Sequence, residues 1–217
     1  MKSLARSPYN YDLPYRSEPG RQVFYHDLRL NPNEINAIPE FRSEPALKAL
    51  VARLNAHDGA FMTHGSALAH RKPEEHGTVI PLSLESDSAP HWSSSYITFS
   101  FWQFSLNTEE RYRAIYEKYN PPGGIGLEVC FVIQPTYFCT RYEQNLSLKY
   151  GDVNATTCVL WVCGWGNSFS VAHSKWRNGL KSLEEFFAAF KLDDELVDPS
   201  ALTVSHHMLN PNPNSQR

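Results

Sequence analysis

Two nearly unbroken apolar runs dominate the second half of the chain. Residues 127–133 read LEVCFVI and residues 157–163 read TCVLWVC, and both have the length of a strand. Continuous apolar runs of this length are typical of strands that are covered on both faces of a sheet. We therefore predict two central strands at these positions.

A different pattern, with a period of two, occurs at 95–104, SYITFSFWQF, where polar and aromatic or aliphatic residues alternate. This alternation predicts a strand with one apolar face. Weaker patterns predict strands at 21–30, 78–84 and 145–150, whereas the Gly- and His-rich stretch 60–77 is expected to be a loop.

Helical spacing of apolar residues occurs in three places. Residues 44–55 place an apolar stripe on one face, with Ser43 as a candidate cap. Residues 108–119 carry a stripe of Tyr and Ile residues. A last helix is expected to begin at Ser182, because Glu185 three residues later completes a capping box.

The order of these elements predicts an α+β domain, with helices segregated from a mostly antiparallel sheet. Residues 1–20 contain Pro, Tyr and Arg without periodicity and are interpreted as an extended arm. Residues 21–200 are expected to form a single domain, and residues 201–217, which contain repeated Asn-Pro pairs, a flexible tail.

Composition narrows the class of protein. The 217 residues include 20 Lys+Arg and 23 Asp+Glu, a balance that argues against a dedicated nucleic-acid binder. Aromatic residues make up 13% of the chain, which is enough to build a core. No apolar run approaches the roughly 20 residues that span a bilayer, and no secretory signal is visible. We therefore expect a cytoplasmic protein with no membrane and no nucleic-acid partner.

Cysteine and histidine usage gives little sign of a metal site. The four cysteines are never at C-x-x-C spacing, and we expect buried free thiols; they are Cys130, Cys139, Cys158 and Cys163. Two disulfides, in any of three connectivities, remain possible if the protein is exported. Four histidines fall within residues 57–76, but no H-E-x-x-H occurs, so no metal site is predicted.

Three segments carry a family resemblance: VFYHDLRLNPNEI at 23–35, HWSSSYITFSFW at 91–102 before the helix at 108–119, and LEVCFVIQP at 127–135. In this order they resemble the ADP-ribosyltransferase superfamily, particularly its enterotoxin-A-like members. The resemblance covers about residues 21–180. It implies the split sheet of that superfamily and NAD as co-substrate.

The resemblance also implies roles for single residues. His26 would hold the ribose hydroxyls of NAD and act in catalysis, and Arg29 matches the turn after the first strand. The Ser-Thr-Ser element that braces the nicotinamide would be formed by Ser95, Thr98 and Ser100. Tyr142 is a candidate for stacking on the nicotinamide ring.

The catalytic carboxylate of the superfamily has no direct match. The corresponding strand, 154–163, contains no acidic residue, so Glu143 is named as the candidate acid, with Glu128 also nearby. A carboxylate is needed because cleavage of the glycosidic bond builds positive charge on the ribose. Two functions are left open: an ADP-ribosyltransferase acting on an unknown acceptor, or a non-catalytic relative that binds a protein or a small-molecule ligand. A small-molecule enzyme of unrelated type is a more distant alternative.

Overall fold

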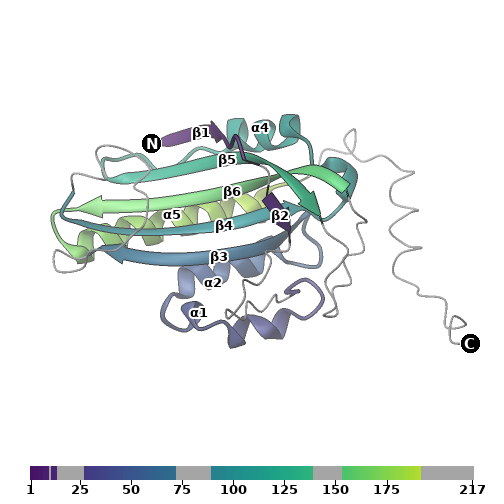
Figure 1. Cartoon of the computed structure of the whole chain (residues 1–217). Coiled ribbons are helices and arrows are strands. Elements are labelled where there is room, and N and C mark those ends of the chain that lie inside the picture. Colours follow the sequence, from purple (N-terminus) through teal and green to yellow (C-terminus); the bar gives the residue numbers. More distant parts are fainter. Residues whose placement is uncertain (10, 14–26, 72–88, 139–152, 192–217) are drawn as a thin grey trace, which may run out of the picture.

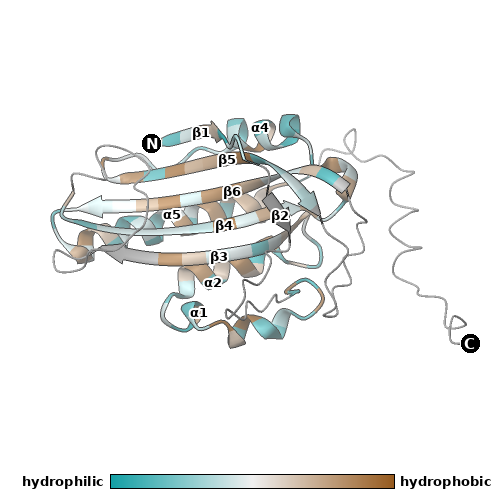
Figure 2. Cartoon of the chain, viewed as in Figure 1, coloured by the Kyte–Doolittle hydropathy of each residue, from teal (hydrophilic) through white to brown (hydrophobic). Residues whose placement is uncertain are grey.

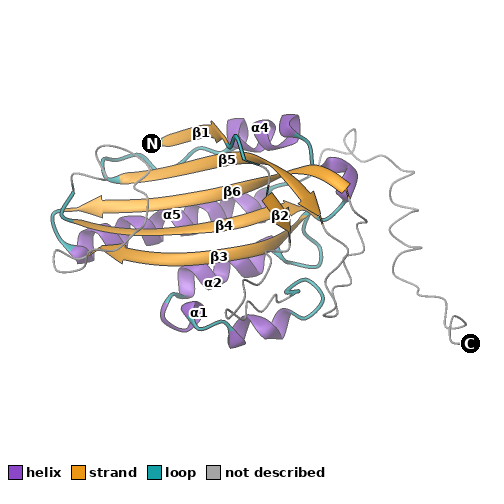
Figure 3. Ribbon diagram, viewed as in Figure 1, coloured by secondary structure: helices purple, strands orange, loops and turns teal. Residues whose placement is uncertain are grey.

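The computed structural model describes residues 1–9, 11–13, 27–71, 89–138 and 153–191. Its centre is one six-stranded sheet with the order β1-β5-β6-β4-β3, in which β2 also pairs with β5 (Figures 1 and 3). The strands are β1 Lys2–Arg6, β2 Tyr11–Leu13, β3 Phe61–Arg71, β4 His91–Phe101, β5 Leu127–Phe138 and β6 Val153–Gly166.

The chain is thus α+β as predicted, but the sheet is single and mixed instead of split and mostly antiparallel. Antiparallel pairing joins β3 to β4, β4 to β6 and β6 to β5. Both β1 and β2 pair with β5 in parallel. They lie in the segment 1–20, which we interpreted as an extended arm. Their pairing partner is more than 100 residues away in the sequence, so no local pattern predicts the pairing.

The described helices are η1 Pro32–Ala37, α1 Glu40–Ser43, α2 Pro45–Leu54, η2 Phe104–Leu106, α4 Glu109–Lys118 and α5 Phe169–Ala189. The long helix α5 crosses one face of the sheet, behind the strands in Figure 1, and packs on β6, β4 and β5. Side chains from α2 and α4 join the same core. We call this side of the sheet the helix face. The opposite side, which is turned toward the viewer in Figure 1, is called the open-view face.

Strand pleating divides the side chains of the sheet between these two faces. The helix face carries the main core, which includes Ile97, Phe99, Val129, Phe131 and Leu160. Figure 2 shows the corresponding apolar bands along β5 and β6. The open-view face carries the alternate residues, many of them hydroxylated, and most of these are buried as well. Burial on both faces agrees with the apolar runs in β5 and β6.

Glycine lets α5 approach the sheet closely. A Cβ atom at Gly164 of β6 would lie 2.4 Å from the backbone oxygen of Ala172 and 2.4 Å from the backbone nitrogen of Trp176. A Cβ at Gly179 would lie 2.7 Å from Leu127 Cδ1. Contacts this short do not occur between real atoms, so the helix and β6 meet backbone to backbone at Gly164.

Several predicted elements are confirmed, with small shifts of their ends. The strands at 95–104, 127–133 and 157–163 correspond to β4, β5 and β6, and the helices at 44–55 and 108–119 to α2 and α4. The cap of α2 is Glu44 and not Ser43, which belongs to α1.

Other predictions were wrong or lie outside the described residues. The expected loop at 60–77 contains the strand β3, and the last helix begins at Phe169 instead of Ser182, capped by the hydroxyl of Ser168. Residues 28–30 form a turn instead of a strand. The predicted strands at 78–84 and 145–150, and residues 21–26, lie outside the described residues.

Two further findings concern thiols and membranes. Cys130, Cys158 and Cys163 are free and buried, as expected, whereas Cys139 lies outside the described residues. Burial raises the pKa of all three thiols, so they stay protonated near neutral pH.

In the described part of the chain, no helix is long and apolar enough to cross a membrane.

Candidate functional site

Four of the residues implied by the ADP-ribosyltransferase resemblance are described: Arg29, Ser95, Thr98 and Ser100. The remaining three, His26, Tyr142 and Glu143, lie outside the described residues, so the structure does not place the candidate acid or the ribose-binding histidine. Ser95, Thr98 and Ser100 are buried, and Arg29 is half-buried.

Arg29 joins the turn at 28–30 to the segment between α2 and β3. Its Nη1 donates to the carbonyl oxygens of Ala56, Gly59 and Phe61, each at 3.0 Å. Its Nη2 donates to the carbonyl oxygen of His57 at 2.9 Å, and the guanidinium lies 4.8 Å from the centre of the Trp102 ring. Four backbone acceptors therefore occupy this side chain, which stabilises the loop that leads into β3.

The three hydroxyls of the implied Ser-Thr-Ser element do not come together. Ser95 lies on the helix face, where its Oγ accepts a hydrogen bond from Trp176 Nε1 at 3.0 Å. Thr98 and Ser100 lie on the open-view face, and both are fully buried. The strand geometry thus separates Ser95 from the other two, because its position is odd and theirs are even.

Ser100 pairs with a buried histidine that the sequence analysis had placed in a loop. His64 Nε2 lies 2.7 Å from Ser100 Oγ. Complete burial lowers the pKa of His64 to about 3, so the imidazole is neutral at physiological pH. Farther across the same face, Thr157 Oγ1 accepts from Gln134 Nε2 at 3.2 Å and lies 2.7 Å from Thr136 Oγ1. The open-view face therefore holds a buried hydroxyl-rich network at this end of the sheet.

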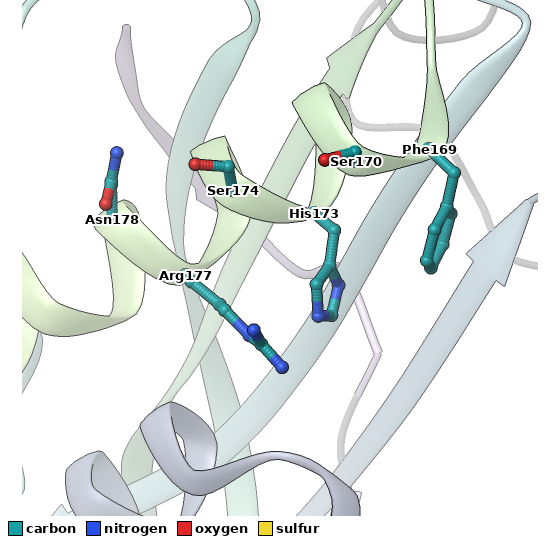
Figure 4. A pocket seen from close by; sticks show the side chains of 6 residues that line it. All are labelled: Phe169, Ser170, His173, Ser174, Arg177 and Asn178. Carbon is teal, nitrogen blue, oxygen red and sulfur yellow. The ribbon is translucent and has the colours of Figure 1, made fainter.

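A cavity of about 420 Å³ lies against the first three turns of α5. It is lined by Phe169, Ser170, His173, Ser174, Arg177 and Asn178 (Figure 4). These residues form two stripes at four-residue spacing, one with Phe169, His173 and Arg177 and the other with the two serines and Asn178. Residues four apart lie above one another on a helix, so each stripe presents its side chains to the same side.

A buried carboxylate fixes one wall of this cavity. Glu44, 6% exposed, accepts from Arg177 Nε at 3.3 Å and from Nη2 at 3.1 Å. Its other oxygen lies 3.4 Å from His173 Nε2. The opposite ring nitrogen of His173, Nδ1, lies 3.3 Å from Ser93 Oγ on β4. The start of α2, the first half of α5 and β4 are thereby connected through polar side chains.

The chain Ser93–His173–Glu44 contains the residue types of a hydrolytic triad, but its geometry does not suit that chemistry. Ser93 is fully buried beneath α5, so a substrate in the cavity does not reach its hydroxyl. Burial lowers the pKa of His173; the Glu44 carboxylate opposes this shift and the Arg177 guanidinium reinforces it. The imidazole is also stacked between Phe169, at 5.3 Å between centroids, and Trp176, at 5.1 Å. The cluster holds the cavity wall in place.

Sequence reasoning missed this cavity because the predicted helix began at Ser182. The signal was present in FSVAHSKWRN, where aromatic, imidazole and guanidinium side chains recur every fourth residue. The partner Glu44 is 129 residues from His173 and carries no local signal. Within the described segments, no group of three or more His, Cys, Asp or Glu side chains has the geometry to hold a metal ion.

Comparisons of the chain with protein-family models, with curated proteins and with solved structures found no match. The site must therefore be interpreted from its own geometry.

Proposed function

We propose that the chain is a non-catalytic binding module that takes a small carboxylate-bearing molecule in the cavity on α5. The observation that carries this proposal is the cavity itself, in which Glu44 fixes the position of the Arg177 guanidinium. The hydrogen-bonded serine behind this wall, Ser93, is buried next to His173. Its volume of about 420 Å³ lies in the range of small-molecule sites, about 300–1,000 Å³.

The lining favours a ligand that accepts hydrogen bonds. Arg177 donates to Glu44 through Nε and Nη2, and its side chain is still 46% exposed where it lines the cavity. Ser170 and Ser174 add two exposed hydroxyls. A planar carboxylate matches guanidinium and hydroxyl donors in this arrangement, and the ring of Phe169 offers an apolar surface beside it.

The exposed hydroxyls of Ser170 and Ser174 have no general base beside them among the described lining residues, which supports binding over turnover in this cavity. Both ring nitrogens of His173 already face polar atoms, Ser93 Oγ on one side and Glu44 on the other. A general base needs a free nitrogen within hydrogen-bond reach of the substrate. The cluster therefore gives the wall rigidity and a fixed charge pattern instead of a reactive group.

The test is a titration of the ¹⁵N-labelled protein with benzoate and, as an uncharged comparison, benzamide. We expect benzoate to shift the amide signals of residues 169–178 and benzamide to shift them much less. Ser174→Leu, which fills the cavity from an exposed position, should remove the benzoate response. Lys181→Leu, an exposed change on α5 outside the cavity lining, should leave it unchanged. Equal responses in all three proteins, or none in the wild type, would contradict the proposal.

ADP-ribosyl transfer is the second candidate, because Thr98 and Ser100 share the open-view face and NAD is the co-substrate that the resemblance implies. Calorimetric titration of NAD together with an assay of nicotinamide release separates the alternatives. Release that disappears in His26→Ala would support a transferase. Binding of NAD without release would support a binding module with NAD as its ligand. If the protein neither binds NAD nor releases nicotinamide, NAD is excluded as its ligand.

A further inference from the structure

A second group of polar atoms lies on the open-view face, at the other end of the sheet from His64. Strand register places Ser94 of β4, Cys163 of β6 and Glu128 of β5 in one row across three neighbouring strands. Alternate positions of a strand share a face, so the three side chains project on the same side, away from α5. In Figure 1 this is the side turned toward the viewer.

Glu128 is buried without full compensation. It is 3% exposed, and its Oε1 accepts a hydrogen bond from Ser3 Oγ at 3.0 Å. Its Oε2 is buried and has no hydrogen-bond partner. Ser94 Oγ, in a side chain that is 2% exposed, interacts with the Cys163 thiol and has no oxygen or nitrogen partner. A buried carboxylate oxygen without a donor is costly, and in native proteins it usually signals an ion, a ligand or a bound water.

Aromatic rings flank this row on both sides. Trp92 of β4 and Trp165 of β6 are paired, and each lies two residues from the row along its strand. They pack with Cys163 in a small apolar cluster of their own. On the other side of the row, Tyr96 and Trp161 are paired, with ring centroids 5.0 Å apart. Trp92 and Trp165 are buried, whereas Tyr96 and Trp161 are only half-buried, so the Tyr96 side of the row is the more exposed of the two.

The chemistry of the row does not suit a transition metal. Burial raises the pKa of Cys163 to about 12, with the Glu128 charge adding to the effect, so this thiol is not a thiolate ligand near neutral pH. The described residues also contain no cluster of three metal-binding side chains. Aromatic rings on both sides of a row that ends in a carboxylate instead match an organic cation, which gains from ring faces as well as from the opposite charge.

We propose that Glu128 and Ser94 form the floor of a binding site for a protonated primary amine, with Tyr96 and Trp161 holding the organic part of the ligand. An ammonium group supplies N–H donors to the unpartnered Glu128 Oε2 and to the hydroxyl oxygen of Ser94. A quaternary ammonium lacks these donors and satisfies neither oxygen. The site is separate from the α5 cavity, lies on the other face of the sheet, and takes a ligand of opposite charge.

The experiment uses phenethylammonium as the probe, followed by calorimetry and by tryptophan fluorescence. Its comparison compounds are 2-phenylethanol, which has the same ring without the charge, and benzyltrimethylammonium, which has the charge without N–H donors. We expect phenethylammonium to bind at least about tenfold more tightly than either, because hydrogen bonds to a charged group are worth roughly that much or more. Equal affinity for the alcohol, or no binding of phenethylammonium at all, would overturn the proposal and leave water as the occupant.

Substitutions at Glu128 and at a control residue test whether phenethylammonium binding depends on the Glu128 carboxylate. Glu128→Gln should weaken phenethylammonium binding about 10- to 100-fold, because it removes the charge and keeps the shape. Glu185→Gln, a matched change at a side chain 68% exposed on α5, should have no effect. Without ligand, Glu128→Gln should melt no lower than the wild type, since it removes an incompletely paired buried charge.

Ser94→Ala provides the second, independent variant if Glu128→Gln does not fold. It removes the hydroxyl acceptor and should also weaken phenethylammonium binding, by less than the charge change does. Unchanged amine affinity in either folded variant would place the bound amine elsewhere and overturn the assignment.

Discussion

Among the buried polar residues, His64 makes the free energy of unfolding depend on pH. Its imidazole is completely buried against Ser100, and burial lowers its pKa to about 3 from a usual value near 6.5. Between these two pH values the unfolded chain binds a proton that the folded chain does not. The free energy of unfolding therefore falls as pH drops through this window, by up to ~1.4 kcal/mol per pH unit from this residue.

The prediction is checked by urea unfolding at a series of pH values between 7 and 4. The wild type should lose stability over this range more steeply than His64→Gln, whose amide does not titrate. Carboxylates elsewhere contribute the same background to both proteins, so the difference between the two slopes isolates His64. Parallel slopes would show that His64 becomes protonated within the folded protein.

The candidate residues named from the sequence also show how far residue types alone can be interpreted. Ser95, Thr98 and Ser100 were grouped because the family resemblance implies a Ser-Thr-Ser element, yet the strand pleat directs Ser95 toward Trp176 and Ser100 toward His64. Arg29 was assigned to a cofactor turn, whereas four backbone carbonyls occupy its donors. In each case the partner comes from a distant segment. Glu128 was considered only as an available acid, and its incomplete pairing is visible only in the structure.

Among the elements, α5 explains why strands and helices were predicted with unequal success. Its second half has a clear apolar stripe and was expected, but its first half mixes Ser, His, Lys and Asn and contains the pair Asn178-Gly179. Such residues lower the local helix propensity. The first half is helical because it packs on β6 and because Glu44 pairs with Arg177 and His173. Tertiary contacts thus override a weak local signal, as they also do for the small residues of β3.

The contact between α5 and β6 predicts a difference between two glycine substitutions. Gly164→Ala should lower the free energy of unfolding by about 1–3 kcal/mol or more, because its Cβ would meet backbone atoms of Ala172 and Trp176 that cannot move aside locally. Gly179→Ala should cost less, since its Cβ meets the movable side chains of Leu127 and Val162, and alanine favours the helix by about 1 kcal/mol.

Chemical denaturation of the two variants and of Gly123→Ala provides the measurement. No atom lies within 4 Å of a Cβ at Gly123, so that variant should unfold like the wild type and serves as the control. If Gly179→Ala proved the more damaging substitution, the backbone contact at Gly164 would not be the point that sets the distance between helix and sheet.

At the scale of the whole molecule, the sheet order separates a protected centre from its edges. β6 lies between β5 and β4, and both of its faces are buried, by α5 on one side and by packing on the open-view face on the other. β1 lies at an end of the strand order and pairs with β5 alone in the described sheet. The apolar runs at 127–133 and 157–163 predicted this centre, but the order of the strands required pairings that no local pattern encodes.

Hydrogen exchange of the native protein should therefore be slowest at residues 157–163 of β6, followed by 127–133 of β5. Amides in β6 open only when the pairings on both sides are lost, which is close to global unfolding. Amides in β1 should exchange faster, because detaching this five-residue strand leaves the antiparallel strands and the main core with α5 in place. Exchange in β1 as slow as in β6 would mean that the parallel edge forms one cooperative unit with the rest of the sheet. In that case Ser3 would hold Glu128 as rigidly as the central strands do, and its hydrogen bond would persist until the whole domain unfolds.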